Sequence, residues 1–153
     1  MKTEWSTYSL VDTNVLVYAI DTSDEFKHVL ANELFESSLF GNIRLAVSTQ
    51  ILSELANVCL RLSKSNPGID TNSAEMFISS LVKINELQKL IITPNVVLHA
   101  IKLQRQFNVG FYDSLIAATM KEHGILTIYT EDRSFEKIDG LKVVNPFESK
   151  HGG

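Results

Sequence analysis

Short apolar segments alternate with segments of helical periodicity along almost the whole of this chain of 153 residues. The apolar segments have the length and bounding turn residues of short strands. They lie near residues 9–11, 43–47, 90–92, 125–130 and 142–144. Strands that alternate with helices in this way build a parallel sheet with helices on both faces. We therefore predict a three-layer α/β/α fold with a central parallel sheet of about five strands, and we expect ligands beyond the carboxyl ends of the strands.

Two helices are predicted between the second and third strands. The first begins at residues 48–49 and ends before the polar stretch 63–70, which is rich in turn formers and predicts a loop. Residues 71–73 then cap the second helix, whose last apolar residue is Leu87.

Length and composition describe a single soluble domain. The content of 44% hydrophobic and 21% charged residues is typical of globular proteins. No apolar run approaches the roughly 20 residues that cross a bilayer, and residues 1–6 lack the layout of a signal peptide. We expect one domain over residues 1–148, a frayed tail over 149–153 and a cytoplasmic location.

The charge and the metal-binding residue types narrow the function. A net charge of −4 argues against a general nucleic-acid coat protein, which would be basic, but a nuclease can combine a local acidic site with a local basic rim. The single cysteine, Cys59, excludes an internal disulfide, and its apolar helical surroundings predict a small buried side chain. The four histidines form no pair at helical spacing, which argues against zinc chemistry.

A carboxylate and an amide, Asp12 and Asn14, separate two apolar stretches near the N-terminus. One predicted strand ends at Val11, and an apolar segment resumes at Val15. Burying a carboxylate costs several kcal/mol unless a partner neutralises it. Two interpretations remain open at this point: Asp12 caps the helix that follows, or it belongs to a functional site.

Three further acids stand at comparable places along the chain. Glu54 lies at the border of the apolar stripe of its helix, Asp113 opens a helix, and Asp132 follows the fourth predicted strand. Each has an ordinary alternative, as a surface glutamate or as a helix cap. In a parallel sheet, however, these acids and Asp12 all face the same edge. One shared site explains that convergence better than four separate coincidences.

Four carboxylates at one edge repel one another, which raises their pKa values and destabilises the fold. A bound divalent cation removes that conflict, and an all-oxygen set of ligands suits Mg²⁺ or Mn²⁺. Such an ion serves phosphodiester hydrolysis, since it lowers the pKa of a bound water and neutralises charge on the phosphate. Thr13, Asn14 and Thr130 are placed to support the carboxylates or the water molecules around the ion.

Four short motifs occur in order along the chain. They are Val11-Asp12-Thr13-Asn14, the helix start from Ser48 to Glu54, Tyr112-Asp113-Ser114-Leu115-Ile116-Ala117-Ala118, and Thr130-Glu131-Asp132-Arg133-Ser134-Phe135. With these motifs the sequence resembles the PIN-domain ribonucleases, most of all the short single-domain toxins of VapBC toxin–antitoxin pairs. The resemblance extends from Leu10 to about Phe147, which is nearly the whole chain.

The resemblance implies a PIN-like fold and an endoribonuclease that depends on Mg²⁺ or Mn²⁺. The residues that it implies for the acidic metal site are Asp12, Glu54, Asp113 and Asp132, with Asn14 and Thr130 in support. It also implies a homodimer. In the toxin branch of the family, it further implies a cognate antitoxin that blocks the site.

An RNA substrate requires basic residues that hold its phosphate backbone. Lys102 and Arg105 fall about one turn apart on the predicted helix before Asp113, and Arg133 adjoins Asp132. For each of these three basic residues, ordinary solvated surface charge is the alternative.

Two other classes of function remain open. In the first, the fold holds RNA or a protein partner without cutting it. In the second, Asp12 is the nucleophile of a phosphoryl-transfer enzyme, although Asn14 stands where a D-x-D phosphatase has its second aspartate.

Overall fold

A parallel sheet of five strands forms the centre of the protein. The computed structural model describes residues 7–66 and 69–148, so the predictions made for residues 1–6 and for the tail at 149–153 lie outside the described residues. The strands are β1 (Tyr8–Val11), β2 (Arg44–Ser48), β3 (Leu87–Leu90), β4 (Thr127–Tyr129) and β5 (Lys142–Val144). All neighbours pair in parallel, in the order β3-β2-β1-β4-β5. The predicted fold class is therefore confirmed.

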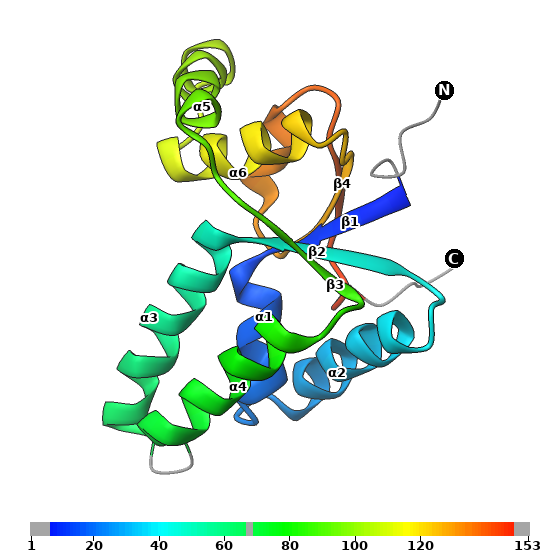
Figure 1. Ribbon diagram of the computed structural model, residues 1–153, viewed down its shortest axis with the longest axis vertical. Coiled ribbons are helices and arrows are strands. Elements are labelled where there is room, and N and C mark those ends of the chain that lie inside the picture. The colour runs from blue at the N-terminus through cyan, green and yellow to red at the C-terminus, as the bar shows by residue number, and fades with distance from the viewer. Residues whose placement is uncertain (1–6, 67–68, 149–153) are drawn as a thin grey trace.

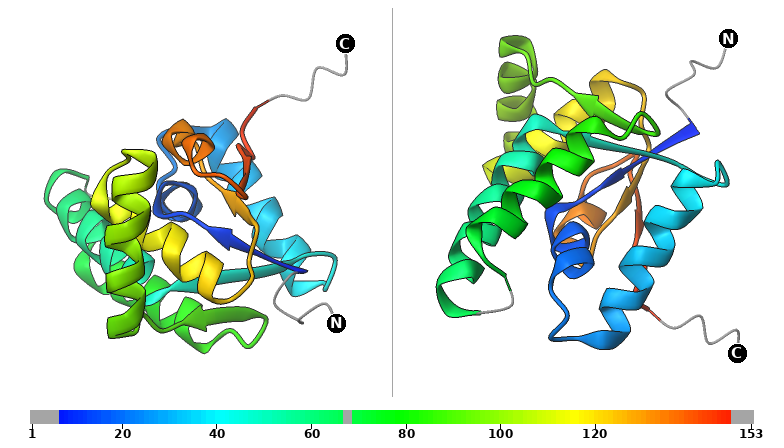
Figure 2. Two further views of the ribbon diagram at one scale, coloured as in Figure 1. Left: turned by 90° about the horizontal axis from the view of Figure 1, so that it is seen from above. Right: turned by 60° about the horizontal axis from the view of Figure 1, so that its bottom comes forward.

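Helices cover both faces of this sheet. They are α1 (Thr13–Ile20), α2 (Glu25–Leu39), α3 (Thr49–Ser65), α4 (Thr71–Lys83), α5 (Pro94–Phe107), α6 (Phe111–Glu122) and the short 3-10 helix η2 (Arg133–Lys137). Helices α1 to α4 lie on one side of the sheet, and α5 and α6 lie on the other (Figures 1 and 2). Within the described part of the chain, no helix is long and apolar enough to cross a lipid bilayer.

The order of the strands reverses at β1, in the middle of the sheet. The chain builds outward from β1 through β2 to β3, and then crosses to β4 and β5 on the other side of β1. Sheets of this type bind ligands beyond the carboxyl ends of their strands, at such a switch point. Val11 pairs with Tyr129, so Asp12 and Thr130, which follow these two residues, emerge side by side there.

Tight packing holds the central strand in place. Leu10 and Val11 of β1 and Ile128 of β4 have no exposed surface, and helix α6 is buried at every residue from 114 to 120. Each large apolar side chain that is fully buried stabilises the fold by about 1.5–3 kcal/mol. The residues that follow β1 therefore project from a rigid base. Cys59 is also fully buried, as its surroundings in the sequence predict.

The third strand begins earlier than the sequence predicts. Strand β3 spans Leu87–Leu90, whereas the apolar pattern predicts it near residues 90–92. The same pattern places Leu87 in the preceding helix, but this side chain is buried in the sheet, and Ile91 is largely exposed beyond it. The prediction is wrong because Leu87 continues the helical spacing of the preceding apolar residues, so the pattern extends beyond Lys83, where α4 ends.

The break between α3 and α4 also differs from the predicted loop at 63–70. Helix α3 continues through Ser65, so the loop begins later than predicted. Asp70 caps α4 in place of the predicted segment 71–73, since its side chain accepts a hydrogen bond from the backbone N–H of Ser73. An aspartate at this position satisfies one of the unpaired amides of the first turn.

Candidate active site

An open cleft of about 440 Å³ lies at the carboxyl edge of the sheet, next to the switch point. All four acids predicted from the sequence line it, and they come from four different segments of the chain. The complete lining consists of Asp12, Thr13, Asn14, Val17, Tyr18, Asp21, Glu54, Val58, Asp113, Ile116 and Asp132. The four acids therefore meet at the edge of the sheet where the topological argument from the sequence places them.

Asp12 lies at the base of the cleft, between β1 and α1, and is only 7% exposed. Its Oδ1 accepts a hydrogen bond from the backbone N–H of Thr13 at 2.8 Å, so it is indeed the N-cap of α1. Its Oδ2 accepts from the Thr130 hydroxyl at 2.7 Å and from Asn14 Nδ2 at 3.2 Å. The capping interpretation is therefore confirmed, and it is compatible with a role in a site, because the cap also fixes the carboxylate in the cleft.

Burial raises the pKa of the Asp12 carboxyl from 3.8 to about 6. The hydrogen bonds from Thr130 and from the Thr13 amide favour the ionised form and oppose this rise, whereas the charges of Glu54 and Asp113 add to it. Among the described residues, no basic side chain forms an ion pair with Asp12. The cleft therefore holds a buried carboxylate whose ionised form lacks a neutralising partner within the described chain.

Asn14 and Thr130 join β1 to the loop after β4. Asn14 Nδ2 also donates to the Thr130 hydroxyl oxygen at 3.1 Å, and Asn14 Oδ1 accepts from the backbone N–H of Glu131 at 3.2 Å. The Thr130 hydroxyl oxygen accepts from the backbone N–H of Asp132 at 2.9 Å. These contacts fix the position of Asp12 relative to Asp132, which is the supporting arrangement that the sequence predicts for both residues.

Glu54 and Asp113 form another part of the wall. Glu54 lies in the second turn of α3, and its Oε2 accepts from the Thr13 hydroxyl at 2.9 Å. Asp113 lies in the first turn of α6 without capping it, since the N-cap is Gly110. Its pKa is raised by burial, and the charges of Asp132 and Glu54 raise it further. Two of the four acids thus have carboxyl groups that resist ionisation in the metal-free protein.

Ser134 is a contact of the site that the sequence prediction missed. Its hydroxyl donates to Asp113 Oδ2 at 2.9 Å, and its backbone N–H donates to Asp132 Oδ1 at 2.9 Å, where Asp132 caps η2. One residue therefore links two acids that are 19 positions apart in sequence. The available signal was its place in the Thr130–Phe135 motif, two residues after Asp132.

Ser134→Ala is expected to raise the pKa of Asp113 further, because the lost hydroxyl hydrogen bond favours the ionised carboxylate. NMR titration of the carboxyl carbons in metal-free protein measures the change. Ser53→Ala is the matched control, since the Ser53 hydroxyl bonds to the backbone of its own helix on an exposed face. An Asp113 pKa that is the same in Ser134→Ala and wild type would show that this hydrogen bond does not stabilise the carboxylate.

The predicted basic contacts lie on exposed surfaces. Lys102 and Arg105 are exposed on α5. The Arg133 side chain is 80% exposed and has a loose contact of 3.5 Å with Glu136. Their role in RNA binding stays a prediction.

A different cation lies close to the cleft. Lys27 Nζ, on α2, is 2.7 Å from Glu131 Oε2, 3.3 Å from the Tyr18 hydroxyl and 4.9 Å from the centre of the Tyr18 ring. The hydrogen bond to Glu131 raises the pKa of Lys27, so the ammonium stays charged. Tyr18 itself lines the cleft. This position of Lys27 could not be predicted from the sequence, because the residue occurs in an ordinary amphipathic helix.

The donor set of the cleft fits a hard divalent cation. Five acidic side chains line the cleft, the four predicted acids and Asp21, and the lining contains no sulfur or imidazole group. Carboxylate oxygens are the ligands that Mg²⁺ and Mn²⁺ prefer. In the described residues, no three side chains of His, Cys, Asp or Glu converge as a preformed cage. Mg²⁺ does not require such a cage, because it keeps several waters and uses about one or two carboxylates. The acids therefore fit an ion that retains part of its water shell.

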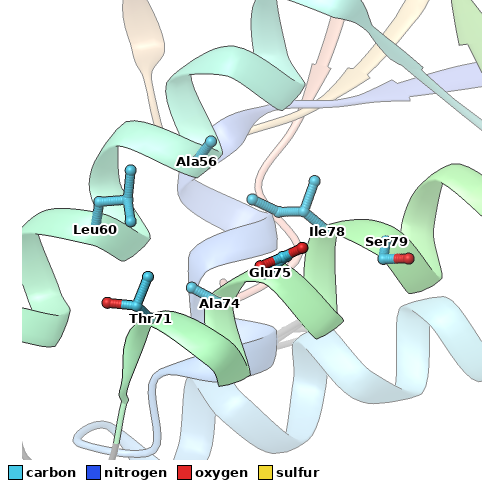
Figure 3. Close-up of a pocket in the computed structure, with 7 residues that line it drawn as sticks. All are labelled: Ala56, Leu60, Thr71, Ala74, Glu75, Ile78 and Ser79. Carbon is cyan, nitrogen blue, oxygen red and sulfur yellow. The ribbon is translucent and has the colours of Figure 1, made fainter.

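A second cavity, of about 420 Å³, lies between α3 and α4 (Figure 3). It is lined by Ala56, Leu60, Thr71, Ala74, Glu75, Ile78 and Ser79. Glu75 is the one ionisable residue in this lining, so the cavity lacks the acids that the first cleft gathers. Its mostly apolar wall suits contact with another apolar group rather than hydrolysis.

The fold and the cleft together define an α/β protein with five parallel strands and an acidic site at the switch point of the sheet. The chain belongs to the PIN-domain family, because the family model of the PIN domain matches residues 9–141. This match confirms the resemblance that the four sequence motifs indicate.

Individual relatives carry VapC names. Ribonuclease VapC48 of Mycobacterium tuberculosis is 43% identical over 35 residues, so the match spans 23% of this chain and about a quarter (24%) of that relative. A chain of the crystal structure of VapBC2 from Rickettsia felis, bound to a DNA fragment from the VapBC2 promoter, aligns with a TM-score of 0.66 at 21% identity. The alignment covers 90% of this chain and 98% of that chain. VapC20 of M. tuberculosis, a sarcin-ricin loop cleaving toxin, aligns with a TM-score of 0.64 at 18% identity. This alignment covers 83% of this chain and 92% of VapC20. These structural similarities show a shared fold.

Proposed function

We propose that this protein is an endoribonuclease that hydrolyses RNA phosphodiester bonds with Mg²⁺ or Mn²⁺. The observation that carries the proposal is the convergence of Asp12, Glu54, Asp113 and Asp132 on one cleft at the switch point of the sheet. A PIN domain with these acids has the donor oxygens for the ion and an open surface for an extended polymer. The names of VapC48 and VapC20 support RNA as the substrate.

Burial and hydrogen bonding suggest different roles for the residues of the cleft. Asp12 and Asp113, whose pKa values are raised by burial, gain most from a nearby cation and would hold it, with Glu54 and Asp132 completing the acidic wall. When bound, the ion would supply an activated water and positive charge for the phosphate. Asn14 and Thr130 keep Asp12 in place during this chemistry through their hydrogen bonds.

We further infer that the protein is a cytoplasmic toxin of a VapBC-type pair, with a cognate antitoxin. The similarity to the VapBC2 structure supports this role. The apolar cavity between α3 and α4, which shares no lining residue with the acidic cleft, offers a surface to a protein partner. A homodimer is part of the same proposal, and the exposed Leu98 and Ile101 on α5 support self-association, because the two side chains leave apolar surface in contact with water.

The phosphoryl-transfer alternative fits the geometry less well. An aspartyl nucleophile needs a carboxylate oxygen that is free to attack phosphorus. Both oxygens of Asp12 accept hydrogen bonds, and the side chain is almost completely buried. These contacts suit a fixed ligand better than a nucleophile.

Removal of divalent ions tests the proposal. Protein dialysed against EDTA is expected to leave a labelled single-stranded RNA intact, and addition of Mg²⁺ or Mn²⁺ is expected to restore cleavage, as resolved on a denaturing gel. Cleavage that continues in EDTA would refute the metal-dependent mechanism. Binding of Mn²⁺ without cleavage of any RNA would support the non-cutting binding module instead.

A further inference from the structure

Gln50, in the first turn of α3, connects two walls of the acidic cleft through one side-chain amide. Its Nε2 lies 2.8 Å from Glu54 Oε1 and 3.1 Å from the backbone carbonyl oxygen of Tyr112. Tyr112 directly precedes Asp113 in the first turn of α6. The amide therefore spans from the carboxylate of one acid to the backbone next to another.

The orientation of this amide is fixed by its partners. A carboxylate and a carbonyl only accept hydrogen bonds, so the NH₂ group of Gln50 must face both of them. Its Oε1 is consequently turned away from both of them, and it is a buried atom without a hydrogen-bond partner among the described residues. An unpaired buried acceptor destabilises a fold, and such groups in native structures call for an explanation.

The hydrogen bond from Gln50 completes a clamp on Glu54. Glu54 Oε2 accepts from the Thr13 hydroxyl at 2.9 Å, and Oε1 accepts from Gln50, so both carboxylate oxygens are held from different elements. Thr13 belongs to α1 and Tyr112 to α6. The contacts of Gln50 and Glu54 on α3 therefore connect three helices, α1, α3 and α6.

We propose that Gln50 is a positioning residue that sets the separation between Glu54 and Asp113 in the cleft. This role rests on the proposed function, since the separation matters for activity only if these acids serve one bound ion. Groups that orient the ligands of a metal typically change its affinity by about 10- to 100-fold when they are replaced.

Gln50→Met tests the role, because methionine keeps the length of the side chain while removing the donor and the unpaired acceptor. We expect the affinity for Mn²⁺, measured by calorimetry, to fall by about 10- to 100-fold. RNA cleavage at low Mn²⁺ should fall with it and recover at high Mn²⁺. The urea midpoint of the metal-free variant should stay close to that of wild type. Gln106→Met, at an exposed position on α5, is the matched control and should change neither quantity.

Gln50→Asn provides a second variant, since it keeps the amide but is too short to reach both partners. The same loss of Mn²⁺ affinity in this folded variant would support the role. Wild-type Mn²⁺ affinity in either folded variant would overturn it, as would a lowered urea midpoint with unchanged Mn²⁺ affinity, which would mark a purely structural contact. Failure of the wild-type protein itself to bind Mn²⁺ would refute the proposed metal site, and this role with it.

Discussion

Asp12→Asn is expected to reduce metal-dependent RNA cleavage by about a thousandfold or more. The substitution removes the negative charge at the base of the cleft, where burial and two neighbouring acids make a cation most favourable. An ion at such a site stabilises the charge of the transition state by several kcal/mol, and each 1.36 kcal/mol corresponds to a tenfold change in rate. Initial rates on a labelled RNA, at saturating Mn²⁺ and with circular dichroism to confirm the fold, measure the loss.

A companion variant separates charge from hydrogen bonding. Both carboxylate oxygens of Asp12 accept hydrogen bonds, one from the Thr13 N–H and the other from Thr130 and Asn14. An asparagine at position 12 would replace one of these oxygens with an NH₂ group, which would then face a donor. Asp113→Asn avoids this conflict, since its described side-chain partner is the Ser134 hydroxyl, which can rotate to accept.

Asp139→Asn is the matched control, because this exposed acid does not line the cleft. It should cleave at the wild-type rate. Full activity in both Asp12→Asn and Asp113→Asn would refute the four-carboxylate mechanism, whereas loss in both with a native fold would support it.

The sequence predicts the meeting of the four acids in one cleft better than it predicts the element boundaries. The four acids converge because each follows a strand or lies in the first turns of a helix at the carboxyl edge, a relation that the parallel topology alone imposes. Local capping chemistry was equally informative. Ser48 caps α3, and Asp12 and Asp132 cap their helices while lining the cleft. A capping role and a role in the site therefore do not exclude each other at the start of a helix.

The contacts between segments could not be read from the sequence. Gln50 bonds to the backbone carbonyl oxygen of Tyr112 on α6, and Ser134 bonds to Asp113 on the same helix. Nothing in the local sequence around Gln50 or Ser134 points to these partners. The predicted start of β3 is wrong for a related reason. Leu87 fits the helical spacing, but its burial in the sheet places it in the strand. Side-chain partners depend on how the elements are packed, which one sequence does not specify at this level.

The stability of the metal-free protein is expected to fall as the pH rises from about 4 to 7. Burial raises the pKa of Asp12 from 3.8, its value in the unfolded chain, to about 6 in the folded protein. Between these values the folded state retains a proton that the unfolded state has lost. The contribution of the protonated carboxyl is therefore complete below about pH 4 and is lost as the pH passes through 6. A difference of about two units corresponds to roughly 3 kcal/mol.

Urea denaturation in EDTA at a series of pH values measures this change, and the difference between wild type and Asp12→Asn isolates it, because the variant has no carboxyl group to titrate at this position. Wild type should lose roughly 3 kcal/mol relative to the variant between pH 4 and 7. Asp139→Asn should follow the wild-type curve. Mn²⁺ should restore wild-type stability at pH 7 but stabilise Asp12→Asn much less, since a ligand stabilises only the folded state that binds it. Parallel curves for wild type and Asp12→Asn would show that folding does not raise the pKa of Asp12, and the buried carboxylate would then need no cation to explain its placement.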